Sequence, residues 1–181
     1  IWPSDQKMRR DLARGFFNVG NIATHIERVD VALKNLNSAV EQFDIILEQE
    51  PDNLECLYLR ALCSWRLGDA TWDTVKPQVA QNSYLDAQRR FAQLAEENPD
   101  VHKYQGMLAG TLINQGYLYS ECKHAADALR VFKKAHEILE PLVEKFTLPD
   151  YEYNLQTVLA EIKSLETKLG ADSTDDANSG S

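Results

Sequence analysis

Histidines are the side chains best suited to catalysis or metal binding in this sequence, and they are His25, His102, His124 and His136. They form neither HxxxH nor HExxH, the spacings with which one helix face holds zinc. His136, Glu137 and Glu140 share one predicted helix, a set more typical of a solvated helix face than of a metal site. Cys122 and His124 flank a predicted helix break, and a metal bound there would need ligands from elsewhere.

Motifs that mark an enzyme are also missing from the sequence. There is no GxSxG nucleophile turn, no Walker phosphate loop and no GxGxxG nucleotide loop. Carboxylates are plentiful, but no spacing isolates a pair for acid–base catalysis. We therefore predict that the protein is not an enzyme, and that it uses no metal and no cofactor.

The cysteines give no sign of a disulfide framework. Cys56, Cys63 and Cys122 are scattered and form no CxxC pair. Cys56 and Cys63 lie on one predicted helix, about 10 Å apart along its axis, which is too far for a disulfide. We expect small buried side chains here, in a pattern that is compatible with a reducing compartment and slightly favours the cytoplasm.

The charge of the chain argues against nucleic acid as a partner. The 181 residues carry a formal net charge of −9, and no basic stripe is visible. No apolar run approaches the roughly 18 residues of a membrane span, and no signal peptide is recognisable at the start. Because the sequence begins with Ile rather than Met, we expect a processed product or a piece of a longer protein.

Helix formers dominate the composition and strand-like alternation is rare, so the sequence predicts an all-α fold. One helix is expected over about 53–67, ending at Gly68, which fits the left-handed position after a helix. The next is expected to begin near Ser83. A last helix over 150–169 has one polar face, which is typical of a helix that caps a stack of repeats. Residues 170–181 have the composition of a disordered tail.

An internal repeat dominates the architecture. Leu12–Leu47 aligns with Leu108–Val143 at a shift of 96 positions, with identical residues that include Gly20/Gly116, Ala32/Ala128 and Ala39/Ala135. A repeat of amphipathic helix pairs indicates a helical repeat protein.

The middle unit, in which Ala61 is the small residue, departs from the outer units. Ala61 and Ala87 are then 26 positions apart, whereas Gly20 and Ala32 are separated by only 12 positions. This difference predicts a 14-residue insertion over 70–83. Within it, Trp72, Val75 and Val79 need cover. They either pack back on the repeat edge, or the insertion forms a lid or a partner-contact element.

The helix pairs resemble the tetratricopeptide repeat (TPR), which has a small residue in its first helix, then Ala, a large apolar residue and Ala in its second, and then Pro. The resemblance covers residues 9–165. The long helices are similar to repeats of planctomycete-type bacterial proteins, some of which follow serine/threonine kinase domains. The residues that carry it are Gly20, Ala32, Leu36 and Ala39, Ala61, Ala87, Phe91, Leu94 and Pro99, and Gly116, Ala128, Phe132 and Ala135.

The resemblance implies a right-handed superhelical stack of antiparallel helix pairs, a TPR-like α-solenoid. We expect one domain over 1–169, with units at about 5–50, 51–98 and 99–148 before the capping helix.

The resemblance also implies a non-catalytic scaffold that binds a protein segment in a concave groove lined by the first helices. Aromatic rings there would supply contact area and amides would bond the segment's backbone, although Asn18 and Asn114 could instead tie neighbouring helices together. The alternative role is a regulatory or self-association arm of a larger protein, such as a bacterial serine/threonine kinase. The candidate partner-binding residues are Arg14, Phe17, Asn18, Asn21, Tyr58, Leu59, Leu62, Trp65, Trp72, Ile113, Asn114 and Tyr117.

Overall fold

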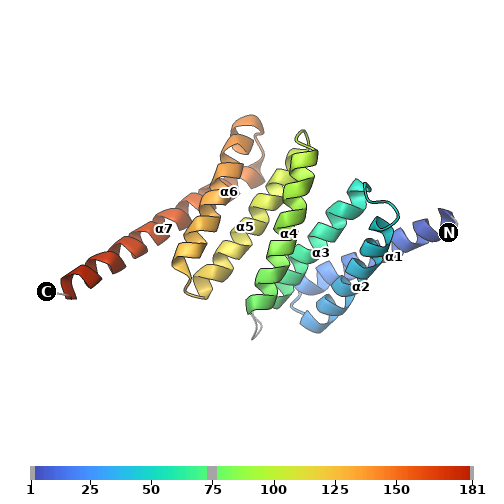
Figure 1. The fold of residues 1–181 in the computed structure, drawn as a ribbon, viewed down its shortest axis with the longest axis horizontal. Coiled ribbons are helices and arrows are strands. Elements are labelled where there is room, and N and C mark those ends of the chain that lie inside the picture. Colours follow the sequence, from blue (N-terminus) through green and yellow to red (C-terminus); the bar gives the residue numbers. More distant parts are fainter. Residues whose placement is uncertain (1–2, 73–76, 180–181) are drawn as a thin grey trace. The chain divides into compact units, whose positions relative to one another are not determined.

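The computed structural model describes the backbone of residues 3–72 and 77–179 and the side chains of residues 5–72 and 77–170. All regular structure in this part of the chain is α-helical, which confirms the predicted fold class (Figure 1). The helices are α1 Pro3–His25, α2 Val29–Leu47, α3 Leu54–Thr71, α4 Pro77–Glu97, α5 His102–Glu121, α6 Ala125–Lys145 and α7 Pro149–Ser179.

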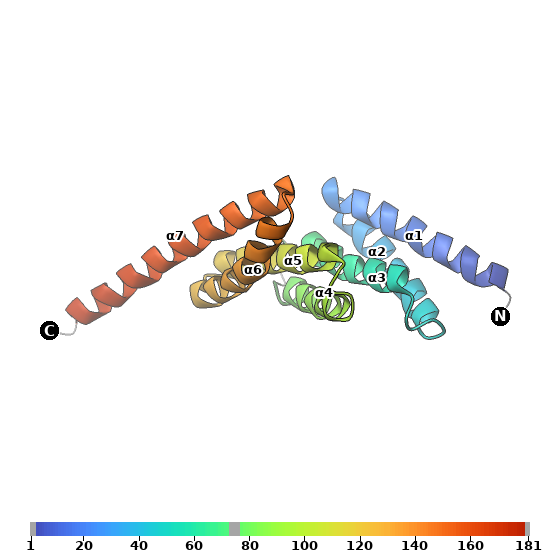
Figure 2. The same cartoon turned by 90° about the horizontal axis from the view of Figure 1, so that it is seen from above.

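The helices form two compact units. Unit 1 is Ile1–Asp100, with α1 to α4, and unit 2 is Val101–Ser181, with α5 to α7. Within each unit, consecutive helices pack side by side in opposite directions; α1 also contacts α3, and α5 also contacts α7 (Figure 2). Each unit is thus built from antiparallel helix pairs. The single domain over 1–169 and a superhelix through both units stay predictions.

The first helix of each outer pair ends in the same turn. Glu27 and Lys123, related by the 96-position shift, both have left-handed backbones, with φ of 57° and 61°. In both turns, the backbone N–H of the following residue donates a hydrogen bond to the carbonyl five positions earlier. Arg28 donates to Ala23 and His124 to Tyr119, each at 2.8 Å. These bonds satisfy carbonyls at the helix end, in the manner of a Schellman turn that has no glycine.

A glycine marks the closest approach within each helix pair. A Cβ on Gly20 would lie 2.7 Å from Leu36, one on Gly68 2.5 Å from the Tyr84 ring, and one on Gly116 2.6 Å from the Phe132 ring. In every pair the large partner follows its glycine by 16 positions, and each glycine follows the previous one by 48 positions. One 48-residue repeat therefore runs through all three pairs, and the 96-position shift covers two such repeats.

The predicted 14-residue insertion over 70–83 is consequently wrong. The small residue of the middle pair is Gly68 rather than Ala61, and the alanine that matches Ala32 is Ala80 rather than Ala87. Each choice was displaced by seven positions, which is close to two helical turns. A displacement of two turns keeps the same helix face, so hydrophobic periodicity could not reveal it.

The residues assigned to the insertion instead lengthen two helices. α3 continues to Thr71, and α4 begins at Pro77 rather than near Ser83. Gly68 lies inside α3 and does not end the helix. A glycine is needed at this position because the Tyr84 ring occupies the space that a side chain would fill. Trp72 packs edge-on against Tyr84, with ring centroids 6.3 Å apart. Val79 is exposed on α4, and Val75 lies outside the described residues.

Unit 2 closes on its last helix. Tyr151, Val158 and Leu165 of α7 join one core with α5 and α6, and the Tyr151 ring lies against Gly106. The helix runs to Ser179, beyond the predicted end of the capping helix at 169 and into the segment whose composition predicted a disordered tail. That segment contains no proline, so no residue in it blocks helical hydrogen bonding.

Candidate functional site

An aromatic face lies along α3 in unit 1, formed by Tyr58, Leu62 and Trp65. Their i, i+4, i+7 spacing places these half-buried side chains in one row. The rings of Tyr58 and Trp65 both pack against Phe91 of α4, with centroid distances of 6.1 and 6.2 Å. Phe91 is fully buried, so the core holds the two rings from behind while their outer edges stay accessible.

Basic side chains border this aromatic face. The Arg66 guanidinium lies 5.3 Å from the centroid of the Trp65 ring and donates a 2.8 Å hydrogen bond to Asp69. On the neighbouring helix α1, Arg14 pairs with Glu55 of α3. These guanidinium groups are held by carboxylates, so the surroundings of the aromatic rings are polar without carrying a large net charge.

Trp65 and Arg66 each have a buried nitrogen without a hydrogen bond among the described residues, the Nε1 of Trp65 and the Nε of Arg66. On α1, the Oδ1 of Asn21 is in the same state. A buried polar group without a partner costs about 1–3 kcal/mol. The packing of Trp65 therefore rests on the contact of its ring with Phe91 rather than on its indole nitrogen.

The 48-residue repeat changes which predicted residues correspond to one another. Trp65, predicted for the edge of the groove, occupies the position of Phe17 and Ile113. Tyr58, predicted as the counterpart of Phe17, instead matches Arg10. In the 48-residue register, Trp65 is therefore the residue of the α3 face that corresponds to Phe17 and Ile113.

The other predicted partner-binding residues do not share one surface in the structure. Phe17 and Leu59 are half-buried and pack against the core of unit 1, while Asn18 is exposed on α1. Ile113 is buried in the core of unit 2, and Asn114 is half-buried. The candidates that share one surface of α3 are Tyr58, Leu62 and Trp65.

Tyr117 of α5 belongs to the packing of unit 2. Its ring meets that of Phe132 edge-on, with centroids 5.4 Å apart. Burial raises the pKa of Tyr117, and the nearby carboxylate of Glu161 on α7 raises it further. The phenol is therefore kept neutral between α5, α6 and α7.

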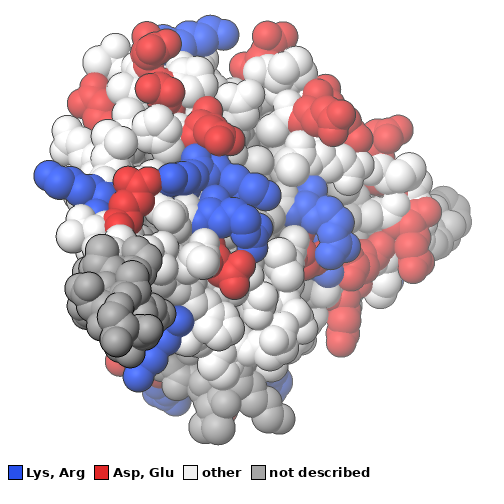
Figure 3. Space-filling model, turned by 60° about the vertical axis from the view of Figure 1, so that its left-hand side comes forward, with Lys and Arg blue, Asp and Glu red and all other residues white. Residues whose placement is uncertain are grey.

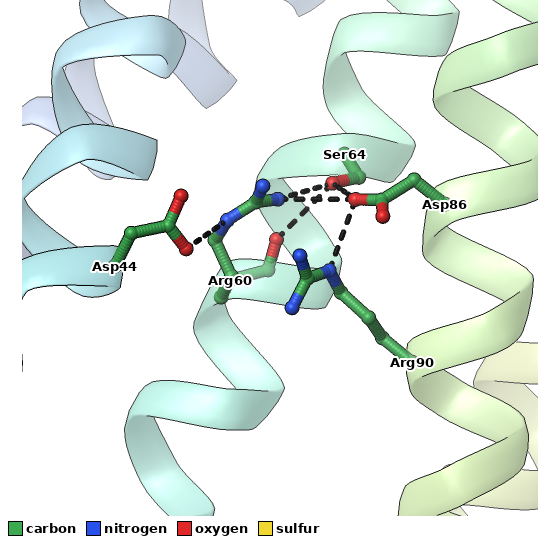
Figure 4. A network of polar contacts seen from close by, with 5 residues as sticks. All are labelled: Asp44, Arg60, Ser64, Asp86 and Arg90. Atoms are coloured by element: carbon green, nitrogen blue, oxygen red, sulfur yellow. Dashed lines mark hydrogen bonds and ion pairs between the residues drawn. The ribbon is translucent and has the colours of Figure 1, made fainter. Parts of the chain in front are cut away.

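A buried polar network, shown in Figure 4, joins α2, α3 and α4 and was not predicted. Arg60, only 9% exposed, donates to Asp44 at 2.8 Å, to Ser64 at 2.6 Å and to Asp86 at 3.2 Å. Ser64 and Arg90 donate to the same Asp86 carboxylate at 2.6 and 3.0 Å. The network thus fastens three helices of unit 1 to one another.

The three donors all bind one oxygen of the Asp86 carboxylate, Oδ2. Burial alone would raise the pKa of Asp86, but the hydrogen bonds from Ser64 and Arg90 and the charges of Arg90 and Arg60 hold it below its usual value. A carboxylate stabilised in its ionised form is a poor general acid. We therefore read the network as structural.

The repeat register contains the signal that could have revealed this network. The Arg60 position is Leu12 and Leu108 in the outer units, and the Ser64 position is Phe16 and Leu112. Polar residues at two positions that are otherwise apolar predict a buried polar cluster, but only once the sequence is aligned on its 48-residue repeat.

The remaining chemistry-bearing side chains form no reactive centre within the described residues. No group of three His, Cys, Asp or Glu side chains is arranged to hold a metal ion there. Burial raises the pKa of the Cys63 thiol to about 12, an effect that Arg60 opposes and Asp44 reinforces, so this thiol stays protonated. Among the described residues, no helix is long and apolar enough to cross a membrane.

Charges of both signs are interleaved on the surface that Figure 3 shows, where a group of basic side chains is bordered by acidic ones. In unit 2, such neighbours include the ion pairs Lys133–Glu166 at 2.7 Å and Arg130–Asp127 at 2.9 Å. Exposed pairs of this kind contribute about 0–1 kcal/mol each, so they contribute more to solubility than to stability.

Comparison with known proteins gives a fold likeness alone. No family model matches the chain, and no curated protein matches it. A solved structure, that of the de novo designed helical repeat protein DHR64, is similar at 14% sequence identity, with 92% of this chain and 83% of that chain covered and a TM-score of 0.44. The evidence for the repeat in this chain is therefore the three glycine contacts and the constant 48-position interval between them.

Proposed function

We propose that the chain is a non-catalytic protein-binding module, a divergent relative of the TPR family with 48-residue units. The TPR-like sequence pattern supports this proposal, because each unit repeats a glycine in the first helix against a large apolar residue in the second. Fully buried alanines at matching positions also support it, including Ala32, Ala80 and Ala128. Helix pairs that approach so closely form a stiff support for side chains on their outer faces.

The observation that carries the binding role is the aromatic face of α3. Tyr58 and Trp65 offer large ring surfaces whose rotamers are fixed by Phe91, so a partner would not have to order them. Rigid aromatic side chains at the centre of a surface are the usual energetic focus of a protein interface. Leu62 between them completes a row that fits an amphipathic helix or an extended segment bearing apolar side chains.

The proposal is tested with a displayed library of random peptides selected on the immobilised chain. We expect enrichment of peptides with spaced apolar residues, and loss of these peptides when Leu62→Asp and Trp65→Ala are combined. Leu85→Asp, at an exposed apolar position of α4, is the matched control and should retain them. Circular dichroism establishes that each variant remains helical. Equal enrichment by the wild type and the doubly substituted chain would show that the α3 face is not the binding surface.

A further inference from the structure

A second apolar surface lies on α1, and we call it the apolar face of α1: Met8, Leu12, Gly15, Val19, Ile22 and Ile26. The five large side chains are between 47% and 63% exposed, and a Cβ at Gly15 would meet open space. Single exposed apolar residues are common, but a contiguous apolar face on a soluble chain marks an interaction surface.

The spacing of this face is that of a coiled coil. Its residues alternate at intervals of four and three from Met8 to Ile22 in α1, and the pattern ends at Ile26, the first residue after the helix. This is the a and d pattern with which one helix packs against another over its whole length. The occupant expected from this geometry is therefore a second helix lying alongside α1.

The repeat shows how the fold uses the same positions elsewhere in unit 1. On α3, Met8, Gly15 and Ile22 are replaced by Cys56, Cys63 and Ala70. Cys56 and Cys63 share a core with Ala39, Phe43 and Ile46 of α2, and Ala70 shares one with Ala32 and Leu36 of α2. On α3, the first helix of its pair, these positions thus pack against α2, the second helix of the preceding pair. On α1, no described residue covers them.

In a head-to-tail assembly, the apolar face of α1 in one copy would pack against the last helix, α7, of the next copy. The side of α7 available for this contact would have to be apolar, but it is polar. The positions that match the inward side of α1 are Thr157, Glu161, Ser164 and Lys168. Tyr153 and Leu159 are exposed on α7, but they are six residues apart and therefore point to different sides. The chain offers its own α1 as the complementary apolar helix.

We propose that two copies of this chain pair through the apolar face of α1, with the two helices antiparallel. An antiparallel pair places Met8 against Ile26 of the second copy, Leu12 against Ile22, and Gly15 against Val19. The small glycine thus faces a β-branched side chain, whereas a parallel pair would set Gly15 against Gly15 and leave a gap. The proposal does not rest on the protein-binding role, because the aromatic face lies on α3.

Two further features fit the antiparallel arrangement. A hollow of about 310 Å³ borders the C-terminal half of this face, lined by Val19, Ile22, Ala23, Ile26, Arg28 and Val31. It lies opposite Met8 and Leu12 of the second copy, and Met is well suited to fill an irregular space. Beside the face, Asp11 lies opposite His25 of the second copy, a carboxylate against a hydrogen-bond donor.

Sedimentation velocity of the full chain over micromolar to millimolar concentrations tests the pairing. We expect a dimer for the wild type, and a dissociation constant raised about 30-fold or more by Leu12→Asp or Ile22→Lys, since each buries an unpaired charge. Leu85→Asp, exposed on α4, should leave the dimer intact. A wild type that stays monomeric throughout overturns the proposal and leaves the helix of a different protein as the occupant.

The direction of pairing is tested by mixing the two charged variants. In an antiparallel dimer, Asp at position 12 of one copy faces Lys at position 22 of the other, so the mixture should form a heterodimer although each variant alone is monomeric. In a parallel dimer these charges would stay apart. Absence of heterodimer, or dimers that persist in both single variants, would overturn the arrangement. Circular dichroism confirms that the surface substitutions leave the helices folded.

Discussion

The ring of Tyr84 lies directly on the backbone of Gly68, where a Cβ would come within 2.5 Å of a ring carbon. Tyr84 is fully buried, and its hydroxyl donates a 2.9 Å hydrogen bond to Asp69 in the next position of α3. The ring is therefore held at both ends, by packing and by a polar bond. This one contact fixes how closely α3 and α4 approach.

Gly68→Ala is expected to destabilise the protein by about 1–3 kcal/mol, because the added methyl group must displace a ring that cannot turn away. The improved helix propensity of alanine, worth about 0.5–1 kcal/mol, offsets only part of this loss. Urea unfolding at neutral pH measures the difference. Gly170→Ala is the control, since the space around that helical glycine is open, and it should cost nothing. Equal stability of the Gly68 variant and the wild type would contradict the close contact.

Arg60→Leu introduces the residue that the outer units carry at this position, yet it should destabilise the chain by about 1–3 kcal/mol. The reason is that the half-buried Asp86 would lose a charged donor. Adding Asp86→Ser should recover part of the loss, and the coupling is read from a double-mutant cycle. Arg130→Met breaks an exposed pair and should change the unfolding free energy by less than about 0.5 kcal/mol. Similar losses for the two arginines would refute the buried network.

The lowered pKa of Asp86 predicts a dependence of stability on pH. A carboxyl group whose pKa is lower in the folded state contributes stability above its unfolded pKa of about 3.9, and this contribution is lost as pH falls through the folded value. We expect Asp86→Asn to lose stability at neutral pH and to show a weaker decline below about pH 4 than the wild type. Chemical unfolding at a series of pH values measures both slopes, and parallel curves would count against the assignment.

Thiol labelling at about pH 8 should separate the three cysteines. Cys122 is half-buried and should react first, whereas Cys56 and Cys63 are buried and have raised pKa values, so they react only when unit 1 opens. A thiol reagent should therefore modify one cysteine rapidly and two more in denaturant. Cys122→Ser should remove the rapid phase, and a rapid phase that persists in this variant would contradict the burial of the other two.

The sequence was sufficient for the fold class and for the helix pairs, because helix propensity and apolar periodicity are local properties. It was insufficient for the alignment of the middle unit. Ala61 and Gly68 lie two turns apart on the same helix face, and hydrophobic periodicity does not distinguish them. The contact with the Tyr84 ring and the 48-position interval between the glycines do. The predicted end of the helix at Gly68 was also wrong, because the sequence does not distinguish a glycine needed for close packing from a glycine that ends a helix.

Site prediction depended on knowing what lies behind each side chain. The family pattern predicts Tyr58 in a concave groove and Trp65 near its edge, and the structure adds Phe91 as the side chain against which both rings pack. Ile113 received the same assignment but is buried in unit 2, which periodicity along one helix cannot show. The apolar face of α1 follows a periodic pattern in the sequence, but periodicity does not show that this face is exposed.

The constant interval between the glycine contacts also has a consequence for how such a chain changes length. Recombination between two gene copies, joining the codon of Gly20 in one to the codon of Gly68 in the other, would delete or duplicate one whole unit. Each repeat glycine in either product would still face a large residue 16 positions later. Growth and shortening by entire units are therefore open to this protein, whereas a deletion of another length between a repeat glycine and its partner would separate the two.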